Sequence, residues 1–210
     1  MKVIVIGAGG QARTVASILR CYPDIEIECF IDKKVRGEGE TICGAPVKED
    51  FSLLQRLFKK GVSNAVIAIG DNSLRGDYAA RVRKMGFNLI NAVHPSAIIA
   101  AEATLGKGVV VAAGAIICPF AQVGNNTIVN TGAIVEHEVK LGDNVHVAPG
   151  ANVAGRVTIG RNSFIGIGAT VKDYVTIGQN VTVGAGSVVL TDVPDNKVVA
   201  GVPAKPIRKK

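Results

Sequence analysis

The chain has 210 residues, of which 48% are hydrophobic and 20% are charged, so it can bury a core and is too apolar to be disordered. Only 4% of the residues are aromatic and 25 are glycine, a composition that favours repetitive β-structure. The apolar runs are far shorter than the roughly 20 residues of a membrane span. The amino terminus lacks the long apolar segment of a signal peptide, so we expect neither membrane insertion nor secretion.

The net charge of +7 favours small anionic ligands, with an uninvolved solvated surface as the alternative. Nucleic acid is not expected, because aromatic residues do not alternate with the basic ones. The cysteines form no CxxC pair and show no metal-ligand spacing, so we expect reduced thiols in a cytoplasmic protein. They are Cys21, Cys29, Cys43 and Cys118.

The first 90 residues alternate apolar strand patterns with amphipathic helix patterns. Such alternation implies a parallel sheet with helices on its faces. Four strands are expected, fewer than the six of a complete dinucleotide-binding fold. The expected strands cover residues 3–6, 27–31, 65–69 and 88–92, and the expected helices cover about 11–21, 50–60 and 73–85.

A glycine-rich loop, GAGG at residues 7–10, joins the first strand to the first helix. With Ala12 it fits the loose dinucleotide fingerprint, and Asp32 follows where that pattern wants an acid. Because a helix amino terminus after such a loop binds any phosphate, the pattern alone does not fix the ligand. It favours a nucleotide-diphosphate sugar, while NAD, a mononucleotide or a plain structural turn remains open.

A period of six governs the chain from Val93 to Val189. Every sixth residue is Val, Ile or Leu, and the residue four places after each is small or β-branched. Bulky and small residues that alternate in this way fill the interior of a narrow coil. The aliphatic positions are Val93, Ile99, Leu105, Val111, Ile117, Val123, Val129, Val135, Leu141, Val147, Val153, Ile159, Ile165, Val171, Ile177, Val183 and Val189.

Glycines repeat with a longer period of eighteen residues. Eighteen is three hexads, so each coil is a three-sided prism with recurring corners. Roughly five coils, stacked strand on strand, would make a prism on the order of 25 Å tall. The two series are Gly106, Gly124, Gly142, Gly160 and Gly178, and Gly114, Gly132, Gly150, Gly168 and Gly186.

The GAGG loop, the segment Ala68–Arg75 and the HPSA sequence at residues 94–97 together resemble one family across nearly the whole chain. It is the family of sialic-acid O-acetyltransferases and nucleotide-amino-sugar N-acetyltransferases. The resemblance implies an α/β plus all-β chain. A small Rossmann-like nucleotide-sugar-binding domain would cover residues 1–92. A left-handed parallel β-helix with a carboxy-terminal cap would cover residues 93–210 and assemble into a homotrimer.

The resemblance also implies a nucleotide-sugar site in the amino-terminal domain. Many members carry histidine at the position of Gln11 and asparagine at the position of Asp71, so this chain departs from the family pattern at both. The implied substrate-binding residues are Gly9, Gly10, Gln11, Asp32, Lys33 and Gly70.

His137 stands between Glu136 and Glu138, at a place of its hexad that faces out of the prism. Acetyl transfer from a thioester needs a base that takes a proton from the attacking amine or hydroxyl. A neighbouring carboxylate stabilises the imidazolium form of such a base. The resemblance likewise implies that His137 is the catalytic base, that Glu138 raises its basicity and that Asn130 orients the amine or a water. A surface charge cluster is the alternative.

The resemblance places acetyl-CoA in a cleft between subunits, in contact with His146, Ile167 and Ala185. His146 follows half a coil after the catalytic candidate, so only two neighbouring prisms could bring both histidines to one substrate. A structural interface histidine is the alternative for His146. The basic tail, Lys205 with residues 208–210, is expected near the CoA phosphates or in a plain structural cap.

We predict an acetyltransferase that N-acetylates a nucleotide-linked amino sugar with acetyl-CoA, in the synthesis of surface-glycan precursors. O-acetylation of a sialic acid is one alternative. A non-catalytic nucleotide-sensing trimer is another, although a sensor needs no base at His137. A metal is not expected, because His94 lies about 11 Å from His137 along the axis, whereas ligands converge at about 2 Å on an ion.

Overall fold

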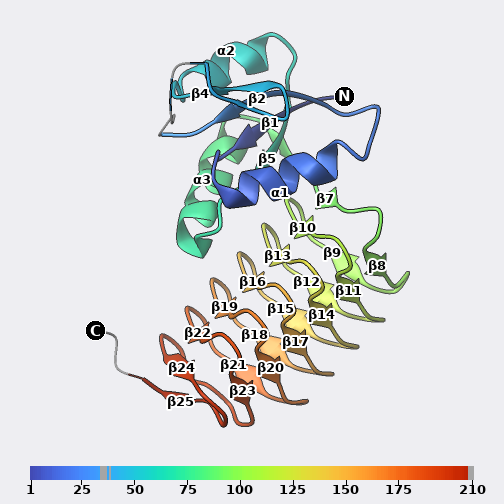
Figure 1. The fold of residues 1–210 in the computed structure, drawn as a ribbon, viewed down its shortest axis with the longest axis vertical. Helices are drawn as coiled ribbons and strands as arrows, with labels where there is room; N and C mark the ends of the chain where they lie inside the picture. The colour runs from blue at the N-terminus through green and yellow to red at the C-terminus, as the bar shows by residue number, and fades with distance from the viewer. Residues whose placement is uncertain (34–36, 38, 208–210) are drawn as a thin grey trace.

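A computed structural model describes residues 1–33, 37 and 39–207. An α/β unit, blue to green in Figure 1, lies against one side of a prism of stacked coils that runs on to the carboxy terminus. Residues 208–210 of the basic tail lie outside the described residues, so their expected place near the CoA phosphates stays a prediction. No helix within the described ranges is long and apolar enough to cross a membrane.

The amino-terminal unit contains a six-stranded sheet with the order β3-β4-β2-β1-β5-β6. All neighbouring strands are parallel except β3 and β4, which pair antiparallel. Because helices connect most of these strands, the sheet is covered on both faces. The strands are β1 (Lys2–Ile6), β2 (Glu26–Ile31), β3 (Thr41–Ile42), β4 (Ala45–Lys48), β5 (Asn64–Ile67) and β6 (Asn88–Leu89).

Alternate residues of β1 face two separate cores. Val3 and Val5 pack with helix α1 (Gly10–Leu19), whose apolar face also reaches the nearest prism strands. Ile4 and Ile6 pack on the opposite face with helices α2 (Leu53–Lys59) and α3 (Asn72–Lys84). This three-layer arrangement confirms the predicted alternation of strands and helices.

The prediction of four strands in this unit was wrong, because it missed the hairpin β3–β4. Its two turn residues, Cys43 and Gly44, have φ angles of 51° and 85°. Two positive φ angles are what a two-residue hairpin turn needs, but cysteine is an uncommon residue there, and Pro46 within β4 argues against a strand. The predicted strand at residues 88–92 is divided, since β6 ends at Leu89 and the prism begins with the next strand.

From residue 92 to residue 189 the prism consists of two-residue strands, and strands eighteen residues apart pair in parallel. A strand sixteen residues after its neighbour and then an antiparallel strand follow at the carboxy-terminal end. The strands form three sheets. The first contains β7 (Ala92–Val93), β10 (Val110–Val111), β13 (Ile128–Val129), β16 (His146–Val147), β19 (Phe164–Ile165) and β22 (Thr182–Val183), and is continued by β24 (Val198–Ala200) and β25 (Lys205–Pro206). The second contains β8 (Ile98–Ile99), β11 (Ile116–Ile117), β14 (Ile134–Val135), β17 (Asn152–Val153), β20 (Thr170–Val171) and β23 (Val188–Val189). The third contains β9 (Thr104–Leu105), β12 (Gln122–Val123), β15 (Lys140–Leu141), β18 (Thr158–Ile159) and β21 (Thr176–Ile177).

The predicted hexad pattern describes the interior of this prism. From Val111 to Val189 the aliphatic positions are buried, and the small or β-branched residues four places later fill the space between them. The amino-terminal unit covers the outer face of the first sheet, where Val110 and Ile128 are fully buried.

Each of the three prism edges repeats a residue with a positive φ angle. We name the edges the glycine edge (residues 112–115, 130–133, 148–151, 166–169 and 184–187), the histidine edge (118–121, 136–139, 154–157 and 172–175) and the asparagine edge (124–127, 142–145, 160–163 and 178–181). Gly150 has φ of 65°, Arg156 has φ of 60° and Asn162 has φ of 61°. On the asparagine edge the repeated side chains also form a ladder, as Asn144 Nδ2 donates to Asn162 Oδ1 at 3.0 Å. Local hydrogen bonding of this kind is why asparagine tolerates the left-handed region.

Candidate active site

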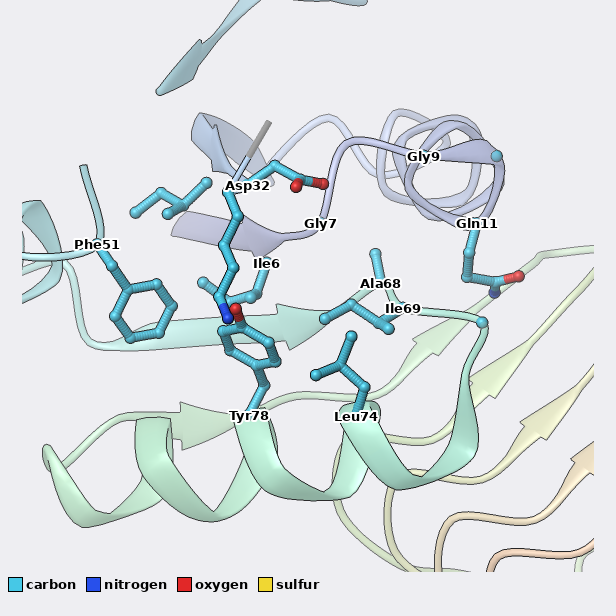
Figure 2. Close-up of a pocket in the computed structure, with 14 residues that line it drawn as sticks. Ile6, Gly7, Gly9, Gln11, Asp32, Phe51, Ala68, Ile69, Leu74 and Tyr78 are labelled. Carbon is cyan, nitrogen blue, oxygen red and sulfur yellow. The ribbon is translucent and has the colours of Figure 1, made fainter. Parts of the chain in front are cut away.

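A cavity of about 480 Å³ opens at the carboxyl ends of β1, β2 and β5 (Figure 2). Ligands of open α/β sheets bind at this end of the strands. All the residues that the resemblance assigned to the nucleotide sugar line this one cavity. They are Gly9, Gly10, Gln11, Asp32, Lys33 and Gly70.

The amino terminus of α1 points a polar, open end into this cavity. Among the described residues no side chain caps the helix, whose N-cap is Gly9, and its first turn carries no acidic residue. A Cβ added at Gly9 or Gly10 would meet no protein atom within 4 Å. Free main-chain amides, a positive dipole end and open space together suit a phosphate or pyrophosphate.

Asp32 fixes the loop that leads into this helix. Its Oδ2 accepts a 2.6 Å hydrogen bond from the main-chain amide of Ala8. Gly7, just before, has φ of 112°, and a Cβ there would lie 2.6 Å from the carbonyl oxygen of Ala68. The sharp turn therefore requires glycine at position 7.

The far wall of the cavity is aromatic. The rings of Phe51 and Tyr78 lie 5.3 Å apart, and Lys33 Nζ lies 5.8 Å from the centre of the Tyr78 ring. In Figure 2 the rings of Phe51 and Tyr78 stand opposite Gln11, which projects at the other end of the cavity. Gln11 Nε2 is buried and finds no hydrogen-bond acceptor among the described residues. A buried donor of this kind is satisfied when a ligand supplies an acceptor.

The catalytic candidate lies on the histidine edge of the prism. His137 and Glu138 are both about half exposed, and His137 Nδ1 lies 3.3 Å from Glu138 Oε2. Arg156, one coil further, donates from Nε to the same carboxylate oxygen at 2.7 Å. The Arg156 hydrogen bond, followed by that of His137, lowers the pKa of Glu138 below its usual value. The Glu138 carboxylate is therefore ionised in the folded protein at neutral pH.

This geometry assigns the proton of the imidazole. Nδ1 carries a hydrogen toward Glu138, which leaves Nε2 as the basic nitrogen. The ring rests on Gly155, where an added Cβ would lie 2.5 Å from Nε2. Arg156 in turn contacts the hydroxyl and the ring face of Tyr174. The sequence reasoning missed Gly155, Arg156 and Tyr174, although each lies eighteen or thirty-six residues beyond the His137–Glu138 pair.

Asn130 and His146 form a second polar pair, on the opposite side of β14 from the histidine edge. Asn130 Nδ2 lies 3.1 Å from His146 Nε2, and His146 Nδ1 lies 3.4 Å from the carbonyl oxygen of Gly70. Burial, reinforced by the charge of Arg75, lowers the pKa of His146 to about 4. His146 is therefore neutral and bridges the cavity-lining loop to Asn130. Its predicted contact with acetyl-CoA stays a prediction.

Ile167 and Ala185 lie on the glycine edge, one coil apart, and both side chains are exposed. The amide of Gly186 donates to the Ile167 carbonyl, so the two residues are stacked along the prism axis. Asn130 lies on the same edge, two coils earlier than Ile167. Two of the predicted cofactor residues, Ile167 and Ala185, thus share one edge with Asn130, whereas His146 lies in β16 and His137 occupies the next edge.

One chain therefore presents two halves of a site. The cavity, Asn130, His146 and the glycine edge form the first half, and the His137–Glu138 pair forms the second. The first can hold an anionic nucleotide and the second can take up a proton. Metal binding finds no support within the described ranges, where no group of three or more His, Cys, Asp or Glu residues is placed to hold an ion.

Two family models match separate parts of the chain. The PglD N-terminal domain matches residues 2–82. The bacterial transferase hexapeptide model (six repeats) matches residues 120–155 and 156–191.

Solved structures are similar over the whole chain. A variant of perosamine N-acetyltransferase from Caulobacter crescentus, in complex with CoA and GDP-perosamine, is 39% identical and has a TM-score of 0.93 over 100% of this chain and 98% of that one. The acetyltransferase domain of PglB from Neisseria gonorrhoeae FA1090, in complex with acetyl coenzyme A, is 36% identical and has a TM-score of 0.88, with 98% of each chain covered. UDP-N-acetylbacillosamine N-acetyltransferase of Bacillus subtilis (strain 168) is 35% identical over 115 residues, which are 53% of this chain and 51% of that protein. The match thus spans about half the length of this curated relative.

The hexapeptide-repeat prism and the α/β unit joined to it place the chain among the acetyltransferases to which it is similar. The chain belongs to the family of nucleotide-amino-sugar N-acetyltransferases. The prediction of this family is confirmed. So are the predicted acetyltransferase class and the Rossmann-like unit followed by a left-handed parallel β-helix.

Proposed function

We propose that this protein transfers the acetyl group of acetyl-CoA to the amino group of a nucleotide-linked amino sugar. The relatives with GDP-perosamine, CoA and acetyl-CoA bound support this substrate class. The observation that carries the proposal is the exposed His137–Glu138 pair, whose Nε2 is available to a substrate. Membership of an acetyltransferase family argues against the alternative of a nucleotide-sensing trimer. The His137–Glu138 pair also argues against it, because a sensor needs no base.

In the proposed reaction, His137 Nε2 accepts a proton from the sugar amine as its nitrogen attacks the thioester carbonyl. Glu138 stabilises the imidazolium that results. Collapse of the tetrahedral intermediate breaks the C–S bond, and His137 returns the proton to the departing thiolate. The products are the N-acetylated nucleotide sugar and CoA, so atoms and charge balance.

The amino-terminal cavity would hold the nucleotide-linked amino sugar. Its diphosphate would lie on the amides of the α1 amino terminus at Gly9 and Gly10, where no protein atom would obstruct it. The buried Nε2 of Gln11 would donate a hydrogen bond. Asn130, held by His146, would orient the amine.

We further propose a cytoplasmic homotrimer in which each site is shared between neighbouring subunits. In one chain the second prism sheet separates Asn130 on the glycine edge from His137 on the histidine edge. A three-fold axis brings different edges of two prisms together at the same height. The outer face of that sheet carries Ile98, which is 63% exposed, and the partly buried Ile116 and Ile134, so it offers apolar surface for a second copy. We also propose that the boundary between the two domains lies at residue 92.

The proposed reaction is tested by mass spectrometry with acetyl-CoA and a panel of GDP-, UDP- and CMP-linked sugars. We expect a product about 42 Da heavier than the substrate from a nucleotide amino sugar, and none from the corresponding hydroxyl sugar. His137→Ala should lower kcat by ~10²–10⁴-fold and leave acetyl-CoA binding unchanged, whereas Glu136→Gln serves as the matched control. Acetylation of a sialic acid hydroxyl, or wild-type turnover by His137→Ala, would overturn the proposal.

A further inference from the structure

Arg75 is a fully buried charged residue that the proposed mechanism does not use. It lies in the first turns of α3, within the segment that the sequence analysis singled out, and its exposure is 0%. Burial lowers its pKa to about 10, with the charge of Asp71 acting in the opposite direction, so the guanidinium is charged at neutral pH. A buried charge is costly unless hydrogen bonds satisfy it, and its partners therefore show what it holds.

Those partners lie on both units of the molecule. Nη1 donates to the carbonyl oxygens of Ile69 and Gly70, each at 3.1 Å, in the loop that lines the cavity. Nε donates to the carbonyl oxygen of Asn126 at 2.7 Å, and Nη2 donates to that of Asn144 at 2.7 Å. The last two belong to successive coils of the asparagine edge. One planar group thus joins the cavity loop to the prism.

Asn72 extends this junction to a third coil. Its Oδ1 accepts from Arg75 Nη2 at 2.8 Å, and its Nδ2 donates to the carbonyl oxygens of Asn162 and Ser163, each at 3.0 Å. Asn72 is only 9% exposed and does not line the cavity. Together, Arg75 and Asn72 fix the start of α3 against three consecutive coils.

The same loop meets the polar pair of the prism. The carbonyl oxygen of Gly70 receives Arg75 Nη1 and also faces His146 Nδ1, whose ring bonds Asn130 through its other nitrogen. A continuous chain of contacts therefore runs from the guanidinium through the cavity loop to Asn130. Whatever moves Gly70 relative to the prism also moves the groups around the amine.

We propose that Arg75 is a positioning residue that holds the nucleotide-sugar cavity in register with the acetyl-transfer region of the prism. The inference rests on the proposed function, in which the sugar binds to one unit and the acetyl donor to the other. The junction touches the cavity only through the carbonyl oxygens of Ile69 and Gly70. The other expected contacts of the two ligands, such as Gly9 and Ile167, lie outside it, so we expect each ligand to bind without the junction. Productive alignment of the two requires it, and a misplacement of about 1 Å can cost 10²-fold in rate.

The geometry requires arginine at this position. Its fork reaches five main-chain carbonyl oxygens and one side chain from a fixed plane. A lysine carries the same charge but only three donors on one nitrogen, so it cannot span both units. Arg75→Lys therefore separates the charge from the junction.

The test compares Arg75→Lys and Asn72→Ala with Arg83→Gln, an exposed arginine of the same helix. Calorimetry gives the affinities for acetyl-CoA and for the nucleotide amino sugar with the highest turnover in the mass-spectrometric panel. We expect both dissociation constants to stay within about 3-fold of wild type while kcat falls about 10–100-fold. Hydrogen exchange of the amides at residues 69–75 should quicken in both junction variants and not in Arg83→Gln.

Asn72→Ala removes a small side chain and carries the test if Arg75→Lys fails to fold. A purely structural role would lower Tm and leave kcat of the folded protein unchanged, and that result would overturn the inference. A loss of nucleotide-sugar affinity equal to the loss in kcat/KM would also overturn it. Absence of turnover by the wild-type protein with every panel member would instead overturn the proposed function, and the inference with it.

Discussion

Gly155 illustrates how one residue acts on a side chain of the preceding coil. The imidazole of His137 rests on its Cα, and no substituent fits between them. The backbone at Gly155 is outside the left-handed region, so an alanine is sterically allowed by the main chain itself. Any effect of Gly155→Ala must therefore come from the displaced ring.

We expect Gly155→Ala to lower kcat at least ~10-fold, because the new methyl group displaces the imidazole ring from Glu138 and with it the basic Nε2. Tm should change by little, since the site is on the surface. Asp173→Ala, at the same place of the next coil, is the matched control and should leave kcat unchanged. Steady-state kinetics and a thermal melt decide the matter, and equal kcat for both variants would contradict the expected role of Gly155.

His146 predicts a pH dependence of stability. Its pKa is about 4 in the folded protein against an ordinary value of 6.5, so only the unfolded chain takes up this proton between those values. The contribution of neutral His146 to the free energy of unfolding is fully present above about pH 6.5. About 2–3 kcal/mol of it is lost as the pH falls to about 4. Urea denaturation of His146→Gln between pH 4.5 and 7 should show a flatter profile than wild type. A wild-type slope in His146→Gln would refute the assignment.

The amino terminus of α1 is the element that decides between a nucleotide sugar and a dinucleotide. Calorimetry should show a nucleotide diphosphate sugar binding far more tightly than NAD or NADP. Gly9→Val should weaken that binding at least ~10-fold, because its side chain meets open space in the protein and would enter the space of the phosphates. Ser17→Ala, on the exposed side of the same helix, is the control. Tighter binding of NAD, lost in Gly9→Val, would reassign the cavity.

Elements with a strict period were predictable, and those held by tertiary contacts were not. The hexads fix each inward residue of the prism because a coil repeats its own environment. The hairpin β3–β4 was hidden by Cys43 at a positive φ and by Pro46. Arg75 was missed as a buried residue because α3 carries several charges, and a charged residue in such a helix normally faces solvent. Its burial is explained by acceptors brought together in the fold, the carbonyl oxygens of the prism and of the loop at Ile69 and Gly70.

The candidate site shows the same division. The outward place of His137 and the cavity-facing place of Gly9 follow from local pattern. The pairing of Asn130 with His146 joins neighbouring coils of the prism, whereas the contact of His146 with the Gly70 carbonyl depends on how the two units dock. No local pattern encodes that docking, although adding eighteen to His137 would have pointed to Gly155.

For the molecule as a whole, the two half-sites predict complementation between defective subunits. In the proposed homotrimer, Gly9→Val has a weakened cavity and His137→Ala lacks the base, so each variant alone should have little activity. In mixed trimers some clefts combine an intact cavity from one subunit with an intact His137 from its neighbour, and activity should reappear. Native mass spectrometry confirms the mixing. Mixed trimers that remain inactive would show that both groups act within one chain.

The eighteen-residue period places equivalent residues of successive coils at regular intervals along the prism axis. Each coil advances by one strand spacing, about 4.8 Å, so Ile167 and Ala185 are separated by one such spacing on the glycine edge. Inserting or deleting one whole coil between the base and these residues would leave every stacked contact in phase. It would nevertheless lengthen or shorten the axial distance from His137 to Ile167 and Ala185 by one strand spacing. If the acetyl donor lies along Ile167 and Ala185, as the sequence predicts, the number of coils sets the length of donor that the protein accepts, with no change in any side chain that touches the ligand.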